Sequence, residues 1–98
     1  MNTHVPVMLV AFELVEQAEN AGIPIGGVDT YGDGDYMTIR LQPADESDAP
    51  RLAHYFGLTE RRAHAYGDGG IESFDGHVGI AAVHTQHSIP AEMVEVTR

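Results

Sequence analysis

The tetrapeptide Tyr-Gly-Asp-Gly occurs twice, at residues 31–34 and 66–69, and each copy follows a segment in which polar and apolar residues are mixed at strand spacing. Asp-Gly is a preferred pair at the centre of tight hairpin turns, because these turns require the positive φ angles that glycine adopts freely and aspartate tolerates. Two antiparallel strand pairs are therefore the strongest constraint on the fold. The repeat is equally consistent with a duplicated unit and with separate use of one turn chemistry.

The first copy predicts a definite hairpin register. A two-residue turn at 33–34 gives the cross-strand pairs Tyr31 with Tyr36, Thr30 with Met37, Asp29 with Thr38 and Val28 with Ile39. One predicted face carries Gly26, Val28, Thr30, Met37, Ile39 and Leu41, and the other carries Gly27, Asp29, Tyr31, Tyr36, Thr38 and Arg40. A wrong register would mix apolar with polar side chains, so this separation favours the turn.

The second copy predicts a three-stranded meander over about residues 60–67, 70–74 and 77–86, with turns at Asp68-Gly69 and Asp75-Gly76. The predicted pairs are Tyr66 with Ile71, His64 with Ser73, Phe74 with His77 and Ile71 with Ile80. The two faces of this meander separate less clearly than those of the hairpin. Either both faces are partly covered or the register slips by one residue.

Two helices complete the pattern. Residues 6–21 repeat apolar side chains at helical spacing and end at Gly22 and Pro24, and a second helix covers about Asp48 to Phe56. Ser47 or Asp48 is its predicted N-cap and Gly57 its C-cap, while residues 88–98 add either an edge strand at 93–97 or a short helix after Pro90. We therefore predict one α+β domain over residues 1–98, with two helices packed on a mainly antiparallel sheet of about five strands.

The charge of the chain restricts its partners. Fifteen acidic residues against five arginines give a net charge of −10, which repels phosphate groups, so we expect no direct binding of nucleic acid or membrane and favour a partner protein with a basic surface. The 98 residues include no cysteine, no membrane-spanning run and no secretory signal, which together predict a cytoplasmic protein. Open sheet edges favour a homodimer, whereas the like charges of two copies oppose it.

The aspartates of the first hairpin do not predict a calcium site. Asp29, Asp33 and Asp35 lie among glycines, but the residues that follow lack the alternating oxygen ligands and the closing glutamate of a calcium loop.

The six histidines do not form a metal-binding motif either. His84 and His87 are three residues apart on a predicted strand and so point to opposite faces, and Glu72 falls on the face opposite to His64. Motifs for nucleophilic catalysis and for phosphate binding are also absent. We assign no catalytic residue, no metal site and no cofactor, and a histidine-based enzyme or metal protein remains an alternative only if its site assembles in three dimensions.

The predicted binding surface is the polar face of the first hairpin, formed by Asp29, Tyr31, Tyr36 and Arg40. Tyrosine and arginine are enriched in binding hot spots, although cross-strand aromatic pairs also stabilise hairpins that bind nothing. The leading hypothesis is a small acidic protein-binding domain. A DNA mimic is the other alternative, and it requires one array built from Glu13, Glu16, Glu19, Asp45, Glu46 and Asp48.

The segment HYFGLTERRAHAYGDGGIESFDGHVGIAAVH, residues 54–84, resembles small uncharacterised α+β proteins of actinobacteria and their phages. In those proteins a helix with an FGL-type glycine cap is followed by an antiparallel meander with an F-x-G corner. The resemblance implies no activity and brings no functional residue to this chain. It implies an accessory protein encoded by a phage or another mobile element.

Overall fold

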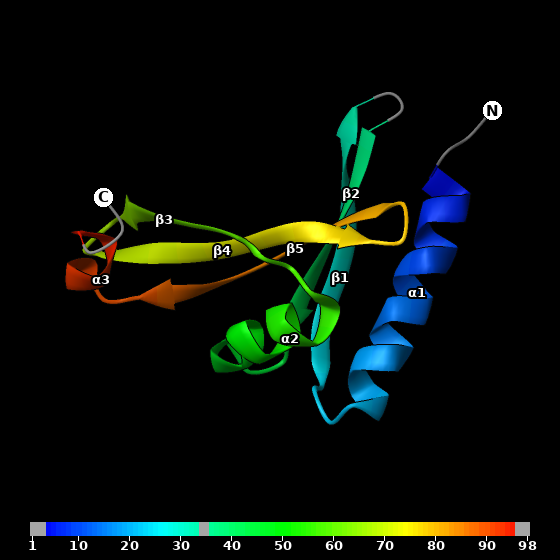
Figure 1. Ribbon diagram of the computed structural model, residues 1–98, viewed down its shortest axis with the longest axis horizontal. Coiled ribbons are helices and arrows are strands. Elements are labelled where there is room, and N and C mark those ends of the chain that lie inside the picture. Colours follow the sequence, from blue (N-terminus) through cyan, green and yellow to red (C-terminus); the bar gives the residue numbers. More distant parts are fainter. Residues whose placement is uncertain (1–3, 34–35, 96–98) are drawn as a thin grey trace.

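The computed structural model describes residues 4–33 and 36–95. Its elements are α1 (His4–Asn20), β1 (Ile25–Asp33), β2 (Tyr36–Pro43), the short 3-10 helix η1 (Glu46–Asp48), α2 (Ala49–Phe56), β3 (Glu60–Tyr66), β4 (Gly69–Val78), β5 (Ala81–Ile89) and α3 (Ala91–Glu95). The predicted order of helix, hairpin, helix and meander is confirmed (Figure 1). The tail forms the helix α3, and the alternative of an edge strand is wrong.

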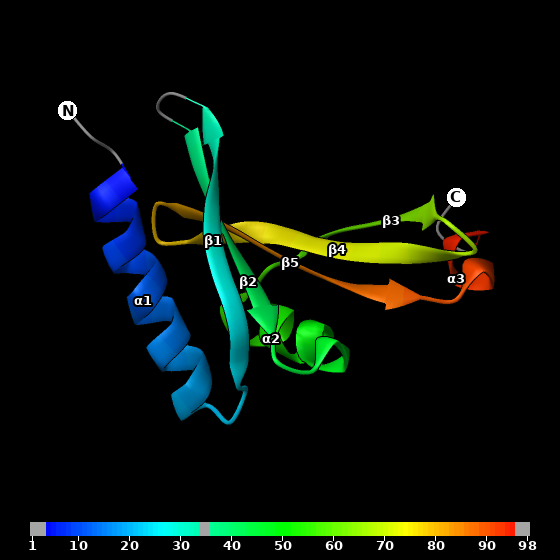
Figure 2. The same ribbon diagram turned by 180° about the vertical axis from the view of Figure 1, so that it is seen from behind.

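One five-stranded sheet holds the molecule together, in the order β1-β2-β5-β4-β3. Its contacts are antiparallel except between β2 and β5, which run parallel over only three residues each, Thr38–Arg40 beside Ala82–His84. The hairpin β1–β2 crosses the meander β3–β5 near this short contact, with α1 beside the hairpin and α3 at the far end of the meander (Figures 1 and 2).

The hairpin register differs from the prediction by two residues. Tyr31 lies opposite Thr38 and Asp29 opposite Arg40, so the predicted pairing of Tyr31 with Tyr36 is wrong. The predicted turn at 33–34 falls partly outside the described residues. A slip of two residues keeps the side chains of residues 27–31 and 37–41 on their predicted faces, because strand side chains alternate with a period of two. Ile39 and Leu41 accordingly lie in the core.

The second corner also differs by two residues, in the opposite direction. Tyr66 lies opposite Gly69, and the turn consists of residues 67–68. Tyr66 is thus the last paired residue before its turn, whereas Tyr31 precedes the last pair of its hairpin, Asp33 with Tyr36, by two residues. The two tetrapeptides hold different positions relative to their turns, which favours separate use of the same turn chemistry over a duplicated unit.

The predicted turn at Asp75-Gly76 is wrong, because β4 continues to Val78 and the chain reverses at residues 79–80. Gly79 supplies the positive φ of this turn, 63°. Gly76 has another role: a Cβ at this position would lie 3.0 Å from Leu58 Cα. The glycine therefore allows the segment after α2 to pack directly on the strand, a contact that turn propensity does not reveal.

Both predicted glycine caps are confirmed. Gly22 follows α1 with a φ of 83°, and Gly57 follows α2 with a φ of 70°. The residue after each glycine donates its amide hydrogen bond to a carbonyl of the helix. Ile23 donates to Ala18 at 2.9 Å, and Leu58 donates to Ala53 at 2.8 Å. This is the arrangement that a left-handed C-terminal residue produces.

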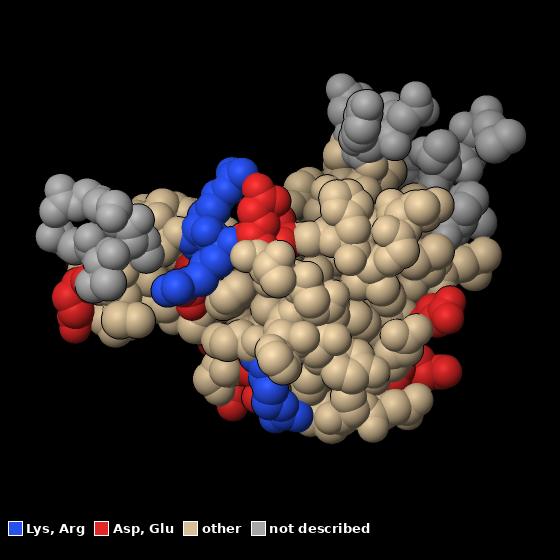
Figure 3. All heavy atoms as spheres, in the orientation of Figure 1, with Lys and Arg blue, Asp and Glu red and all other residues tan. Residues whose placement is uncertain are grey.

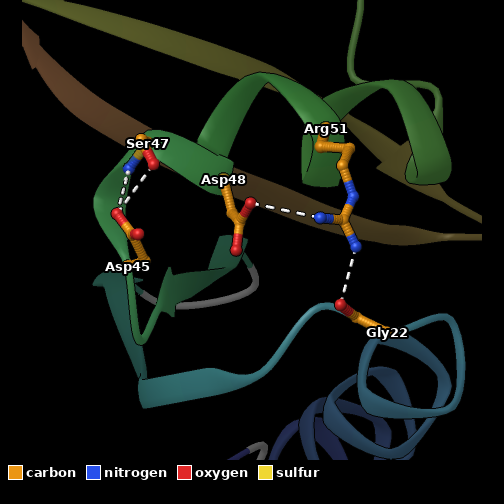
Figure 4. A network of polar contacts seen from close by, with 5 residues as sticks. All are labelled: Gly22, Asp45, Ser47, Asp48 and Arg51. Carbon is orange, nitrogen blue, oxygen red and sulfur yellow. Dashed lines mark hydrogen bonds and ion pairs between the residues drawn. The ribbon is translucent and has the colours of Figure 1, made fainter.

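The start of α2 is more elaborate than predicted. Asp48 is the N-cap residue but makes no capping bond with its side chain, and Asp45 caps the preceding turn η1 instead, accepting from the Ser47 amide at 3.0 Å. Arg51 of α2 donates to the Gly22 carbonyl at 2.6 Å and to Asp48 at 3.2 Å (Figure 4). The bond to Gly22 connects α2 to the C-terminal end of α1.

The core lies between the helices and one face of the sheet. Its buried side chains are Ala11, Leu14, Ala18, Ile23, Ile39, Leu41, Ala49, Leu52, Ala53, Leu58, Phe74 and Val83. Burial of this apolar surface is the main stabilising contribution to the fold. Among the described residues, no helix is long and apolar enough to cross a membrane.

Candidate functional site on the open face of the sheet

The two faces of the sheet have different environments. All three helices pack against one face, which we call the covered face: α1 and α2 enclose the core there, and Val94 of α3 lies where a side chain at Gly70 would be. We call the opposite face the open face. At its centre the hairpin meets the meander, and six polar or aromatic residues form what we call the open-face cluster: Asp29, Tyr31, Arg40, Asp75, His84 and Gln86.

The strand registers put four of these residues in a single row across the sheet. Asp29 on β1 faces Arg40 on β2, which faces His84 on β5, which faces Asp75 on β4. Arg40 binds Asp29 through two hydrogen bonds, from Nε to Oδ1 at 2.9 Å and from Nη2 to Oδ2 at 2.5 Å. This bidentate geometry orients the guanidinium group, and it raises the pKa of Arg40.

His84 occupies the centre of the row. Its Nδ1 lies 2.8 Å from Oδ1 of Asp75, and its Nε2 lies 2.9 Å from Oε1 of Gln86. Because a carboxylate only accepts hydrogen bonds, Asp75 requires the proton on Nδ1 of His84. Both ring nitrogens lie at hydrogen-bond distance from a polar side chain, which restrains the orientation of the imidazole.

Tyr31 lies above this row and connects the hairpin to the meander. Its ring and the His84 ring form a T-shaped pair with a centroid distance of 6.4 Å and an interplanar angle of 85°, and Cζ of Arg40 lies 5.5 Å from the centroid of the Tyr31 ring. Burial and the negative charge of Asp75 raise the pKa of Tyr31, although Arg40 acts in the opposite direction. The side chain is 44% exposed and keeps a neutral hydroxyl that can donate and accept hydrogen bonds.

A groove opens next to the cluster, where β2 and β5 diverge beyond their short parallel contact. It has a volume of about 360 Å³, and its lining includes Gln42, Glu46, Ile71, Gln86 and Ser88. Gln86 belongs to both the groove and the cluster. A molecule bound to Tyr31 and Arg40 would therefore lie next to this polar groove.

The structure brings together three of the four residues predicted to bind. Arg40 contacts both Asp29 and Tyr31, while the Tyr36 side chain lies outside the described part of the molecule. Sequence reasoning missed Asp75, His84 and Gln86, since only the parallel contact of β2 with β5 brings the meander to the hairpin. The alternation of His84 and Gln86 along one strand was the available signal, and it could not show which strand lies alongside.

A second histidine–carboxylate pair lies on the covered face. Oε1 of Glu72 lies 2.7 Å from Nε2 of His87, and Oε2 of Glu72 accepts a hydrogen bond from Nε of Arg61. Glu72 is only 6% exposed, and the His87 ring stacks on Phe74 at a centroid distance of 5.9 Å. Burial would raise the pKa of Glu72, but the hydrogen bonds from His87 and Arg61 outweigh burial and lower it.

Two predictions about the histidines are confirmed. His84 and His87 point to opposite faces, and Glu72 lies on the face opposite to His64. Within the described ranges 4–33 and 36–95, no three histidine, aspartate or glutamate side chains are grouped to hold a metal ion. The Asp29 carboxylate of the calcium hypothesis is bound to Arg40, and Asp35 lies outside the described residues.

The acidic side chains needed for a DNA mimic have varied surroundings. Asp45 binds Ser47, Glu46 accepts from the Ser88 amide at 3.0 Å, and Asp48 pairs with Arg51. Figure 3 shows acidic side chains in separate groups over α1 and beside α2, with uncharged residues between them. This face of the molecule therefore does not present one continuous array of carboxylates.

No protein-family model matches this chain, and it has no significant match among curated proteins or among solved structures.

Proposed function

We propose that this chain is a small acidic protein-binding domain with a regulatory or accessory role, and that the open-face cluster is its contact surface. The main support is the fixed position of Tyr31 and Arg40. Arg40 is held by Asp29 through two hydrogen bonds, and Tyr31 packs between Arg40 and His84. Side chains that are already ordered lose little conformational entropy on binding, which favours affinity.

The energetics of such a cluster also favour recognition over stabilisation. An exposed ion pair contributes only about 0–1 kcal/mol to folding, so the bond between Arg40 and Asp29 adds little to stability. Tyrosine and arginine, in contrast, are among the residues that contribute most to binding when a partner covers them.

The charge of the chain indicates the class of partner. A net charge of −10 attracts a protein with a basic surface and increases the association rate at low salt. The proposal includes a cytoplasmic location and an origin in a phage or another mobile element. The lack of cysteine and the resemblance of residues 54–84 support these two points.

A pull-down from a lysate of the source cells tests the proposal. Wild-type protein on the resin should retain a partner that Tyr31→Ala and Arg40→Ala retain at least about tenfold less, because a hot-spot residue contributes roughly 2 kcal/mol. Tyr36→Ala extends the test to the fourth predicted residue. Tyr55→Ala is the matched control, since Tyr55 is 48% exposed but lies on α2.

Equal capture by wild type, Tyr31→Ala and Arg40→Ala would contradict the proposed contact surface. Loss of capture by Tyr55→Ala alone would instead indicate a contact surface on α2. Thermal melting of each variant should accompany the pull-down, so that a loss of binding is not confused with a loss of folding.

A further inference from the structure

A second groove lies on the covered face, between the C-terminal end of α2 and the strands β3 and β4. It has a volume of about 490 Å³, and its lining includes Pro50, Ala53, Leu58, Thr59, Arg61 and Phe74. Most of this lining is apolar, and none of it is acidic, although the chain as a whole carries a charge of −10. A volume of this size accommodates a small organic molecule.

Arg61 is the cationic side chain in the lining of this groove, and a buried partner holds it in place. Its Nε donates to Oε2 of Glu72, whose other oxygen binds His87. Within the part of the chain that the structure describes, no acceptor binds the terminal Nη groups of Arg61. One edge of the guanidinium is thus anchored in the sheet, and the other edge is available to an incoming anion.

Apart from Glu72, whose two carboxylate oxygens are already bound to Arg61 and His87, two features of the chain oppose an anion here. The C-terminal end of a helix carries a partial negative charge. In α2, however, the amides of Gly57 and Leu58 already bind two of the last four carbonyls, those of Ala53 and His54. The overall negative charge is spread over the surface and is screened over about 8 Å at physiological ionic strength.

From these observations we infer that the groove binds a small carboxylic acid with an apolar body. The carboxylate pairs with the Nη edge of Arg61, and the apolar body lies beside Pro50, above a floor formed by the largely buried side chains of Leu58 and Phe74. Arginine is suited to this role because its planar guanidinium matches a carboxylate in two parallel hydrogen bonds. The site is separate from the open-face cluster and does not depend on the proposed protein-binding function.

Titration with sodium octanoate, followed by calorimetry, tests this inference. Octanoate supplies both features of the ligand, whereas acetate lacks the apolar body and octanol lacks the charge. We expect saturable binding of octanoate with a dissociation constant in the millimolar range or below, and at least roughly tenfold weaker binding of acetate and octanol.

Arg61→Gln should weaken octanoate binding at least about tenfold, because the charge-assisted hydrogen bonds are lost. Arg62→Gln is the matched control: Arg62 is the next residue on β3, its side chain is 71% exposed and lies on the open face. Octanoate should bind this variant like wild type. Equal binding to Arg61→Gln and wild type would overturn the inference, and so would the absence of saturable binding to wild type.

A second variant keeps the test decisive if Arg61→Gln fails to fold. Thr59 lines the groove from the exposed connection after α2, so Thr59→Trp should fill the groove without removing the pair of Arg61 with Glu72. It should abolish octanoate binding, and unchanged binding would overturn the inference. A short acetylated peptide with a C-terminal leucine that binds more tightly than octanoate would also overturn the assignment to a small acid.

Discussion

Two histidine–carboxylate pairs join the same two strands, and only one of them lies under the helices. Asp75 faces His84 and Glu72 faces His87 across β4 and β5, with nitrogen–oxygen distances of 2.8 Å and 2.7 Å. The first pair belongs to the open face, where the Asp75 side chain is 35% exposed, whereas the second is buried with Arg61 and Phe74 around it. The two pairs have similar geometry but should differ in their contribution to stability. A buried charge that loses its partner destabilises the fold, whereas an exposed charge is solvated by water.

The largest expected effect is on the buried pair. Glu72→Gln removes the negative charge between His87 and Arg61 and should lower the free energy of unfolding by about 3 kcal/mol. Urea denaturation at neutral pH measures the loss. Asp75→Asn, the corresponding change on the open face, should cost less than about 1 kcal/mol. Similar losses for the two variants would show that burial does not distinguish the two pairs.

The pH dependence of stability should show the contribution of the Glu72 carboxylate without a mutation. The pKa of Glu72 in the folded protein lies below the ordinary glutamate value of about 4.3, so the folded state binds this proton less readily than the unfolded chain. Its contribution to stability is complete above the unfolded pKa and is lost as pH falls through the folded pKa. Wild type should therefore lose more stability than Glu72→Gln in urea melts between about pH 5 and pH 3. Parallel pH profiles would contradict this expectation.

Gly76 tests the covered face at a position without charge. Gly76→Ala places a methyl group 3.0 Å from Leu58 Cα, where backbone must move, and should cost about 2 kcal/mol. Gly79→Asn is the control at the neighbouring turn, since asparagine tolerates a φ of 63° and nothing lies within 4 Å of the added Cβ. That variant should lose less than about 1 kcal/mol. A larger loss of stability for Gly79→Asn than for Gly76→Ala would contradict this assignment and favour a turn at Asp75-Gly76.

Replacement of Thr85, which lies on the covered face beside Phe74, should increase stability. Thr85 is completely buried, and its hydroxyl has no hydrogen-bond partner among the described residues. Thr85→Val keeps the shape and removes the unpaired polar group, so it should raise the free energy of unfolding by about 1 kcal/mol. Thr59→Val, at an exposed position, should change stability by less than about 0.5 kcal/mol. A destabilised Thr85→Val would point to a hydrogen bond through bound water.

The sequence predicted the helices and strands of this fold better than the contacts between them. Helical periodicity and the glycines at 22 and 57 located both main helices, because these signals are local. Strand parity preserved the faces even where both corners were misplaced by two residues. The missing information was tertiary. Nothing local shows that β5 lies beside β2, or that Gly76 is needed for contact with Leu58, so half of the open-face cluster and one turn escaped prediction.

The smallest expected effect separates recognition from stability on the open face. In a double-mutant cycle of Asp29→Asn and Arg40→Ala, the coupling free energy should be below about 1 kcal/mol, because the pair is exposed and the long arginine side chain loses entropy when it is held in one geometry. Added salt should reduce the coupling further. If both single variants melt close to wild type yet fail in the pull-down, the ion pair orients Arg40 for a partner and is not needed for folding. A coupling of several kcal/mol would instead make this pair a structural element, equivalent to Glu72 and His87, and would remove the distinction between the two faces on which the proposed contact surface rests.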